Sequence, residues 1–244
     1  MTELLIAAYG VATYLLGLAT ILYAIAFAGD LPVPRTLDAG PTLPVAQAVA
    51  VDALLLAAFA LQHSVMARVA FKRALTRVVS PAIERSTYVL AASLALAALM
   101  WLWRPLAEPV IWNVRGHAWA AIAIEIVCWA GWLLVLFSSF LIDHFEMFGL
   151  RQVAARVFGL KAPAPQFRTP SLYRVVRHPL YVGFLMAFWA TPRMTAGHLL
   201  FASAMTGYIL LGIRFEERDL VALFGRRYRD YQRSVGMLLP GKRS

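Results

Sequence analysis

Long apolar runs separated by short polar segments dominate the chain. A helix needs about 20 apolar residues to cross the hydrocarbon core of a bilayer. Four runs have this character, and they predict membrane helices over residues 4–28, 45–66, 87–103 and 118–142. A further stretch, residues 179–213, is too long for one crossing and is interrupted at Pro192. Because proline breaks a helix, this stretch predicts a helical hairpin with arms 179–191 and 194–213.

The C-terminal tail has a different, amphipathic pattern. Its apolar positions recur every three or four residues, at Leu220, Phe224, Tyr228, Tyr231 and Val235. This spacing predicts a helix over residues 214–235 with one apolar face. The other face carries Arg226, Arg227, Arg229 and Arg233. A helix of this kind is typical of one that lies on anionic headgroups.

The composition supports a membrane location. Hydrophobic residues make up 61% of the chain and charged residues 15%, and the mean hydropathy is +0.67. Soluble domains are about half apolar and a quarter charged. The sequence therefore excludes a soluble or disordered chain. It predicts a single-domain, all-α integral membrane protein with five to six transmembrane helices, the C-terminal hairpin included.

The basic residues gather on one side of the predicted membrane. The chain carries 23 Lys and Arg against 13 Asp and Glu, a formal net charge of +10. With six membrane segments, all but four of the basic residues fall on the side of the termini; the exceptions are Arg35, Arg104, Arg115 and Arg193. The positive-inside rule then places both termini in the cytoplasm. The same distribution assigns the charge to a bilayer with anionic headgroups and not to nucleic acid.

Three histidines fall at the cytoplasmic ends of predicted spans, together with four carboxylates. These residues are His63, His144, His178, Asp143, Glu146, Glu216 and Glu217. Ionisable groups at membrane depth are costly and mark functional sites more often than not. The alternative is that each histidine is structural and makes an interfacial hydrogen bond.

The tripeptide Arg177-His178-Pro179 predicts an anion pocket. Proline suits the first position of a helix, so His178 is expected at the helix N-terminus, where free amides and the helix dipole attract a carboxylate or phosphate. The competing interpretation is a basic juxtamembrane anchor in which Glu216 and Glu217 are simply solvated. The chain has one cysteine, no GxG and no HxxxH. We therefore expect no metal site and no Rossmann or P-loop nucleotide fold.

Several motifs resemble those of known membrane methyltransferases. The segment Arg177-His-Pro-Leu-Tyr-Val-Gly183, with Glu216-Glu217, Tyr228 and Tyr231, resembles the C-terminal signature of the isoprenylcysteine carboxyl methyltransferase-like enzymes. Over nearly the whole chain, further motifs resemble the methanethiol S-methyltransferases of the wider NnrU-like group; they include Leu61-Gln-His-Ser64 and Asp143-His-Phe-Glu146. Gly236 departs from this pattern, which has proline there.

The resemblance implies a cofactor, a location and a division of the chain. The cofactor is S-adenosylmethionine, and the implied binding residues are Arg177, His178, Pro179, Tyr181, Glu216, Glu217, Tyr228 and Tyr231. The location is the bacterial inner membrane. Residues 1–142 are then a four-helix membrane part. Residues 143–244 are a cofactor-binding part, in which the cytoplasmic loop and the amphipathic C-terminal helix cover the cofactor pocket.

The resemblance also implies a reaction, the methylation of methanethiol to dimethyl sulfide. A small thiol is mostly protonated at neutral pH, so a base should assist. His144, oriented by Asp143 or Glu146, is the first candidate, and His63 is the second. Three alternatives stay open: a haem-binding, isomerase-like protein of the NnrU-like group, a methyltransferase acting on another thiol, a prenylcysteine or a lipid amine, and a non-enzymatic basic membrane anchor or transporter subunit.

Overall fold

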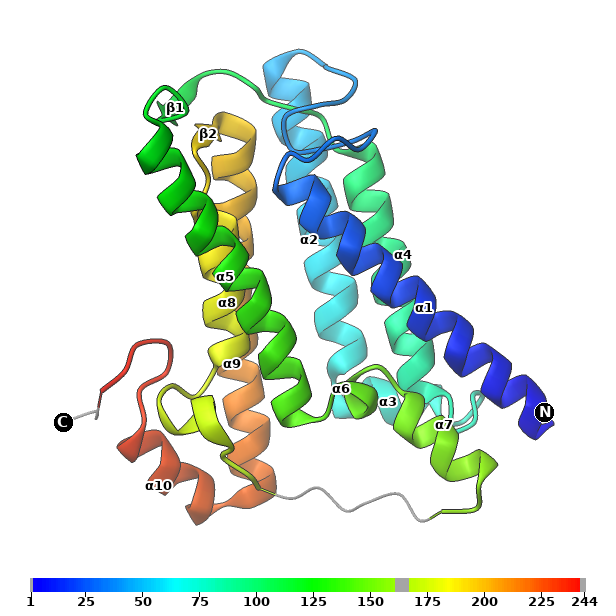
Figure 1. The fold of residues 1–244 in the computed structure, drawn as a ribbon. Coiled ribbons are helices and arrows are strands. Elements are labelled where there is room, and N and C mark those ends of the chain that lie inside the picture. The colour runs from blue at the N-terminus through cyan, green and yellow to red at the C-terminus, as the bar shows by residue number, and fades with distance from the viewer. Residues whose placement is uncertain (1, 161–166, 242–244) are drawn as a thin grey trace. The chain divides into compact units, whose positions relative to one another are not determined.

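The structure is a computed structural model that describes residues 2–160 and 167–241 (Figure 1). Helices make up most of it, and two short strands pair in one small sheet. The elements in chain order are α1 (Glu3–Ala28), α2 (Val45–Ala67), α3 (Val69–Leu75), α4 (Glu84–Leu102), β1 (Val110–Asn113), α5 (Ala118–Ile142), α6 (His144–Met147), α7 (Leu150–Val157), the 3-10 helix η1 (Ser171–Arg174), α8 (Pro179–Trp189), β2 (Arg193–Thr195), α9 (Ala196–Phe224) and α10 (Arg226–Ser234).

The long helices are those of a multi-pass membrane protein. Within residues 2–160 and 167–241, five helices are long and apolar enough to cross a membrane, namely α1, α2, α4, α5 and α9. Helix α8 is apolar but has only 11 residues. The predicted hairpin is present, since α8 ends at Trp189 and α9 begins at Ala196, on either side of Pro192. The predicted all-α membrane fold with five to six such helices is therefore confirmed.

The chain folds as two compact units. Among the described residues, unit 1 holds 2–110, 143–160 and 195–198, and unit 2 holds 111–142, 167–194 and 199–241. This division by packing differs from the functional division expected after residue 142, which stays a prediction.

In unit 1, α1 and α2 both pack against α4, and α7 packs against α1. Gly10 of α1 permits the contact with α7, because a Cβ at this position would lie 2.7 Å from a methyl carbon of Val153. Ile6, Ile83 and Val153 form a buried cluster beside this contact. The short helix α6, which carries His144, directly precedes α7 and packs against it.

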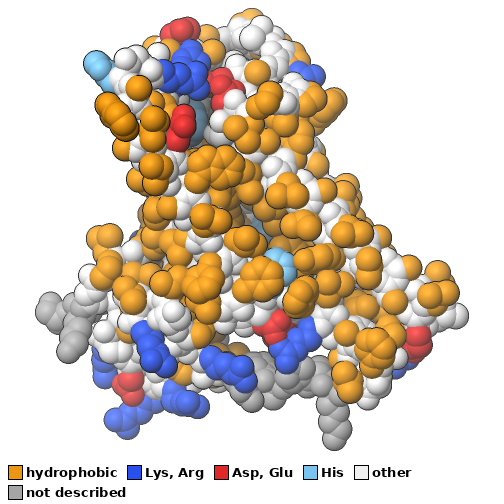
Figure 2. All heavy atoms as spheres, in the orientation of Figure 1, with side chains coloured by type: hydrophobic (Ala, Val, Ile, Leu, Met, Phe, Trp, Pro, Cys, Tyr) orange, Lys and Arg blue, Asp and Glu red, His pale blue; other side chains and the backbone are white. Residues whose placement is uncertain are grey.

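In unit 2, α5 packs along α8 through two glycines. A Cβ on Gly183 would lie 2.6 Å from the carbonyl oxygen of Gly131, and a Cβ on Gly131 would lie 2.7 Å from that of Gly183. Only glycine permits two helix backbones to approach this closely. Apart from Glu125, the exposed residues of α5 are hydrophobic, as expected of a lipid-facing surface; Figure 2 shows hydrophobic side chains over the long helices.

The tail departs from the prediction of one helix over residues 214–235. Helix α9 continues to Phe224, and α10 starts at Arg226. Gly225 between them has a φ of 60°, a conformation that glycine adopts at little cost and that ends a helix. The predicted apolar stripe is thus divided between two helices, and α10 is a separate amphipathic helix of 9 residues.

Candidate functional site

The candidate site in unit 2 starts at the N-terminus of α8. Pro179 opens the helix and His178 is its N-cap residue, as the sequence predicts. The segment after α10 crosses this N-terminus: the backbone N–H of Arg177 donates to the carbonyl oxygen of Gly236 at 2.8 Å, and that of His178 donates to Met237 at 3.2 Å. Backbone bonds therefore tie the tail to the start of α8.

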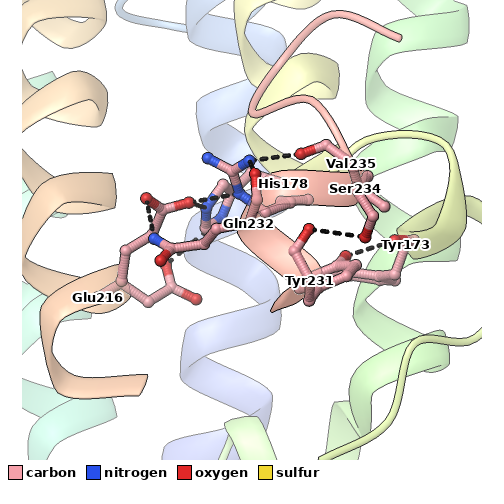
Figure 3. A network of polar contacts seen from close by, with 9 residues as sticks. Tyr173, His178, Glu216, Tyr231, Gln232, Ser234 and Val235 are labelled. Carbon is pink, nitrogen blue, oxygen red and sulfur yellow. Dashed lines mark hydrogen bonds and ion pairs between the residues drawn. The ribbon is translucent and has the colours of Figure 1, made fainter. Parts of the chain in front are cut away.

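A polar network joins the start of α8 to α9 and α10 (Figure 3), and Glu217 of α9 lies at its centre. Its Oε1 accepts from Nε of Arg177 at 2.7 Å and lies 3.1 Å from Nε2 of His178. Its Oε2 accepts from the amide of Gln232 at 2.9 Å. The Arg177 side chain is fully buried, and the Glu217 side chain is 15% exposed. One carboxylate thus joins α8, α9 and α10.

Arg177 also donates hydrogen bonds to the backbone at the end of α10. Its Nη1 donates to the backbone carbonyl oxygens of Gln232 and Val235, at 3.0 and 2.5 Å. Its Nη2 is buried and has no hydrogen-bond partner within the described part of the chain. A buried, unsatisfied guanidinium nitrogen is costly, and it is suited to an anionic ligand.

Glu216, the neighbour of Glu217, is more accessible. Its Oε2 accepts from the hydroxyl of Tyr181 at 3.0 Å and lies 3.9 Å from Nδ1 of His178, while 43% of its side chain is exposed. The two glutamates therefore differ: Glu217 is enclosed by donors, and Glu216 presents a carboxylate toward solvent.

Aromatic side chains close one side of the network. Tyr228 is buried, and Phe167 contacts both Tyr228 and Tyr231, with ring centroids 5.9 and 5.5 Å apart. The hydroxyl of Tyr231 donates to the carbonyl oxygen of Tyr173. Burial raises the pKa of Tyr231 to about 12, and burial together with the nearby Glu217 raises the pKa of Tyr228 further. Both phenols are therefore neutral hydrogen-bond donors at physiological pH.

The proposed thiol-activating residues lie in unit 1. Asp143 caps α6 by accepting from the backbone N–H of Glu146 at 2.9 Å, and it forms an ion pair with Arg151. The Glu146 carboxylate also lies 3.8 Å from Arg151. Nε2 of His144 lies 3.2 Å from the hydroxyl of Tyr14. The structure thus gives His144 a tyrosine neighbour that the sequence did not indicate.

The surroundings of His144 favour the uncharged form of its ring. It is 6% exposed, and Phe148 covers its ring at a centroid distance of 4.7 Å. Burial lowers the pKa of His144, because a charged imidazolium is disfavoured away from water. At neutral pH its ring can accept a proton.

His63 makes a similar pair elsewhere in unit 1. Its Nε2 lies 2.7 Å from the hydroxyl of Tyr88 on α4. The guanidinium of Arg85 lies 5.0 Å from the centre of the Tyr88 ring and donates from Nε to the carbonyl oxygen of Met147. Tyr88 and Arg85 therefore connect His63 to the backbone at the last residue of α6.

All eight predicted cofactor residues lie in unit 2, and the four predicted activators lie in unit 1. Sequence reasoning missed three site neighbours, Gln232, Tyr14 and Tyr88. Gln232 falls four residues after Tyr228, on the same face of α10, which is a signal for it. Tyr14 and Tyr88 lie within apolar helices that contain other aromatic residues, and neither gives such a signal.

The chain is similar to several bacterial enzymes over most of its length. It is 56% identical over 232 residues to the methanethiol S-methyltransferase of Mycobacterium tuberculosis, covering 95% of this chain and 94% of the relative. It is 55% identical over 236 residues to methanethiol S-methyltransferase 1 of Bradyrhizobium diazoefficiens, covering 97% and 82%. A more distant similarity, 34% over 189 residues, links it to Nurim of Danio rerio, covering 73% and 67%. No family model and no solved structure matches the chain.

Proposed function

Because the chain belongs to the methanethiol S-methyltransferase family, we propose that it methylates methanethiol with S-adenosylmethionine as the methyl donor. A carbon–sulfur bond forms between the thiol sulfur and the methyl group, and the bond from that methyl group to the cofactor sulfur breaks. The products are dimethyl sulfide, S-adenosylhomocysteine and the thiol proton. The observation that carries the proposal is the identity of about half of all residues to these relatives over nearly the full chain.

The network around Glu217 suits this cofactor, which brings an electrophilic methyl group and an amino-acid end with one carboxylate and one ammonium. Arg177, whose Nη2 has no hydrogen-bond partner among residues 2–160 and 167–241, and His178 at the start of α8 would bind the carboxylate. Glu216, whose carboxylate is partly exposed, would bind the ammonium. Pro179 starts α8, and the dipole of this helix favours a carboxylate at its N-terminus. The amides of Arg177 and His178, expected to be free, already donate to Gly236 and Met237.

Glu217 holds Arg177 and His178 in place in this assignment. Tyr181 orients Glu216 through their hydrogen bond. Tyr228 and Tyr231 form the wall that excludes water from the methyl group. In-line methyl transfer requires little more from a protein than the alignment of both reactants and the exclusion of water.

We assign the removal of the thiol proton to His144. A neutral imidazole is required of a base, and burial maintains that form. In this proposal Tyr14 orients the ring through Nε2, and Asp143 and Glu146 act indirectly by fixing α6 together with Arg151. His63, paired with Tyr88, is the second candidate for the base.

The proposed location is the bacterial inner membrane, with both termini in the cytoplasm. It is supported by the basic residues gathered on the side of the termini and by the positive-inside rule. This orientation gives the site access to S-adenosylmethionine, which is made in the cytoplasm. Methanethiol, a small apolar molecule, can reach the site from the bilayer.

The decisive experiment incubates the purified full chain in nanodiscs with S-adenosylmethionine and methanethiol and measures dimethyl sulfide in the headspace by gas chromatography. We expect product in proportion to S-adenosylhomocysteine. Cofactor binding without product would overturn the assignment of the thiol, and a prenylcysteine and a lipid amine are then the acceptors to assay. A Soret absorption band without affinity for S-adenosylmethionine would overturn the proposal in favour of a haem protein.

A further inference from the structure

Helix α10 presents a basic face beside the end of a membrane helix. Arg226, Arg229 and Arg233 recur at steps of three and four and therefore share one face. All three are exposed, and the side chains of Arg226 and Arg233 are 94% and 81% exposed. Asp230 lies 3.7 Å from each of these two and offsets only part of their charge. Figure 2 shows Lys and Arg side chains gathered around this end of unit 2.

The opposite face of α10 belongs to the candidate cofactor site. Tyr228 on this face is buried, and Gln232 donates to Glu217. Directly after the helix, the carbonyl oxygens of Val235 and Gly236 accept hydrogen bonds from Arg177. A displacement of α10 must therefore disturb the donors and acceptors of the Glu217 network.

We propose that the face formed by Arg226, Arg229 and Arg233 docks on anionic phospholipid headgroups, and that this docking holds the Arg177–Glu217 network in the form that binds S-adenosylmethionine. The second half of this inference rests on the proposed function. The membrane then acts as a regulator of the enzyme: a bilayer rich in anionic lipid favours cofactor binding, and a zwitterionic bilayer does not.

The position of α10 argues for lipid as the partner. Gly225 alone separates α10 from α9, a helix apolar enough to span a membrane, so α10 lies on the side of the membrane at which α9 ends. Arginine can lay its apolar stem along hydrocarbon while its guanidinium reaches a phosphate. Leu223 and Leu239, just before and after α10, are 58% and 79% exposed. Basic and apolar side chains together are typical of helices that bind anionic membranes.

The experiment places the full chain in nanodiscs of phosphatidylcholine alone or of phosphatidylcholine with phosphatidylglycerol. Two quantities are measured, the affinity for S-adenosylmethionine and the hydrogen exchange of residues 226–237. We expect slower exchange in the anionic nanodiscs and an affinity about fivefold higher, the lower end of the usual coupling between two sites.

Two triple variants with the same change in charge separate docking from general electrostatics. The test variant is Arg226→Gln/Arg229→Gln/Arg233→Gln, and the control is Arg73→Gln/Arg77→Gln/Arg156→Gln, which removes three exposed arginines of unit 1. We expect the test variant to lose the effect of phosphatidylglycerol on both quantities. The control variant should keep both effects.

The outcomes are distinct. Equal exchange in both nanodiscs would overturn the docking, and slower exchange with unchanged cofactor affinity would overturn the coupling. Loss of the lipid effect in the control variant as well would show that bulk charge, not α10, attracts the lipid. Slower exchange in a protein that binds no S-adenosylmethionine in either nanodisc would refute the proposed cofactor while leaving the lipid docking supported.

Discussion

The Nε of Arg177 donates to Oε1 of Glu217 at 2.7 Å, and this pair joins the start of α8 to α9 across 40 residues of sequence. The Arg177 side chain is fully buried, so its charge is compensated mainly by this one carboxylate. A buried charge that loses its partner is strongly destabilising. The pair is therefore important for stability and, in the proposed function, for binding.

Replacement of Glu217 tests both consequences. Glu217→Gln removes the negative charge from the side chain that accepts from Arg177, His178 and Gln232. We expect the free energy of unfolding to decrease by about 3 kcal/mol, because the buried Arg177 charge loses its partner. The affinity for S-adenosylmethionine should fall by about tenfold or more, because Arg177 and His178 are no longer held in place. A loss of about 1.4 kcal/mol in binding free energy corresponds to a factor of ten. Denaturation of the purified protein and cofactor titration measure the two effects.

Glu216→Gln is the matched control for that variant. Because 43% of the Glu216 side chain is exposed, we expect a change in unfolding free energy below about 1 kcal/mol. Its affinity for the cofactor should still fall, since the ammonium loses its proposed partner. Equal destabilisation by the two replacements would contradict the structural distinction between the two glutamates.

The close contact between α5 and α8 predicts that a larger residue at position 183 destabilises the protein. In Gly183→Ala the new methyl group would lie 2.6 Å from the carbonyl oxygen of Gly131, and the helices must separate. Overpacking of this kind costs about 1–3 kcal/mol. Gly207→Ala on α9 is the control, because a Cβ there meets no heavy atom within 4 Å. Thermal unfolding should show a lower midpoint for Gly183→Ala alone, and equal midpoints would argue against this packing.

The membrane helices could be predicted from sequence because their signal is local. A run of about 20 apolar residues is sufficient evidence for a span, and the break at Pro192 follows from the chemistry of proline. The end of α9 could not be placed, because residues after Ile213 continue a helical pattern without interruption until Gly225. The positive φ of that glycine depends on how the tail packs on α8, which no local pattern reports.

Some residues of the site could likewise be predicted from local sequence patterns, and others could not. Arg177, His178 and Pro179 form a recognisable helix start, and Glu216 and Glu217 follow an apolar run directly, so the sequence singles them out. The contact of Gln232 with Glu217 and the contact of Tyr14 with His144 join residues 15 and 130 positions apart. Such pairs arise from tertiary packing. The spacing of Gln232 from Tyr228 places it on the site face of α10, but no pattern in a single sequence reports which residue it contacts, and Tyr14 has no such signal at all.

The pair of Tyr14 and His144 predicts an effect on the chemical step. In Tyr14→Phe the ring of His144 loses the hydroxyl that we propose orients it, and we expect kcat to fall about tenfold, less than for loss of the base itself. The affinity for S-adenosylmethionine should not change. Tyr9→Phe is the control, since it removes another hydroxyl from α1, one bonded to Thr87 at 3.1 Å. An equal loss of activity in both variants would show that Tyr14 has no specific role, and His63 would then be the first candidate for the base.

The buried state of His144 predicts a dependence of stability on pH. Burial lowers the pKa of His144 in the folded protein below the ordinary histidine value of about 6.5. As the pH falls through that ordinary value, the unfolded chain takes up a proton that the folded protein does not, so stability decreases toward acid pH. When the pH is lowered from about 7.5 to about 5.5, the free energy of unfolding should decrease less in His144→Gln than in the unaltered protein. His117→Gln replaces an exposed histidine and should keep the full dependence. A slope that is identical in all three proteins would show that His144 titrates normally, and a base role at neutral pH would then lose its electrostatic support.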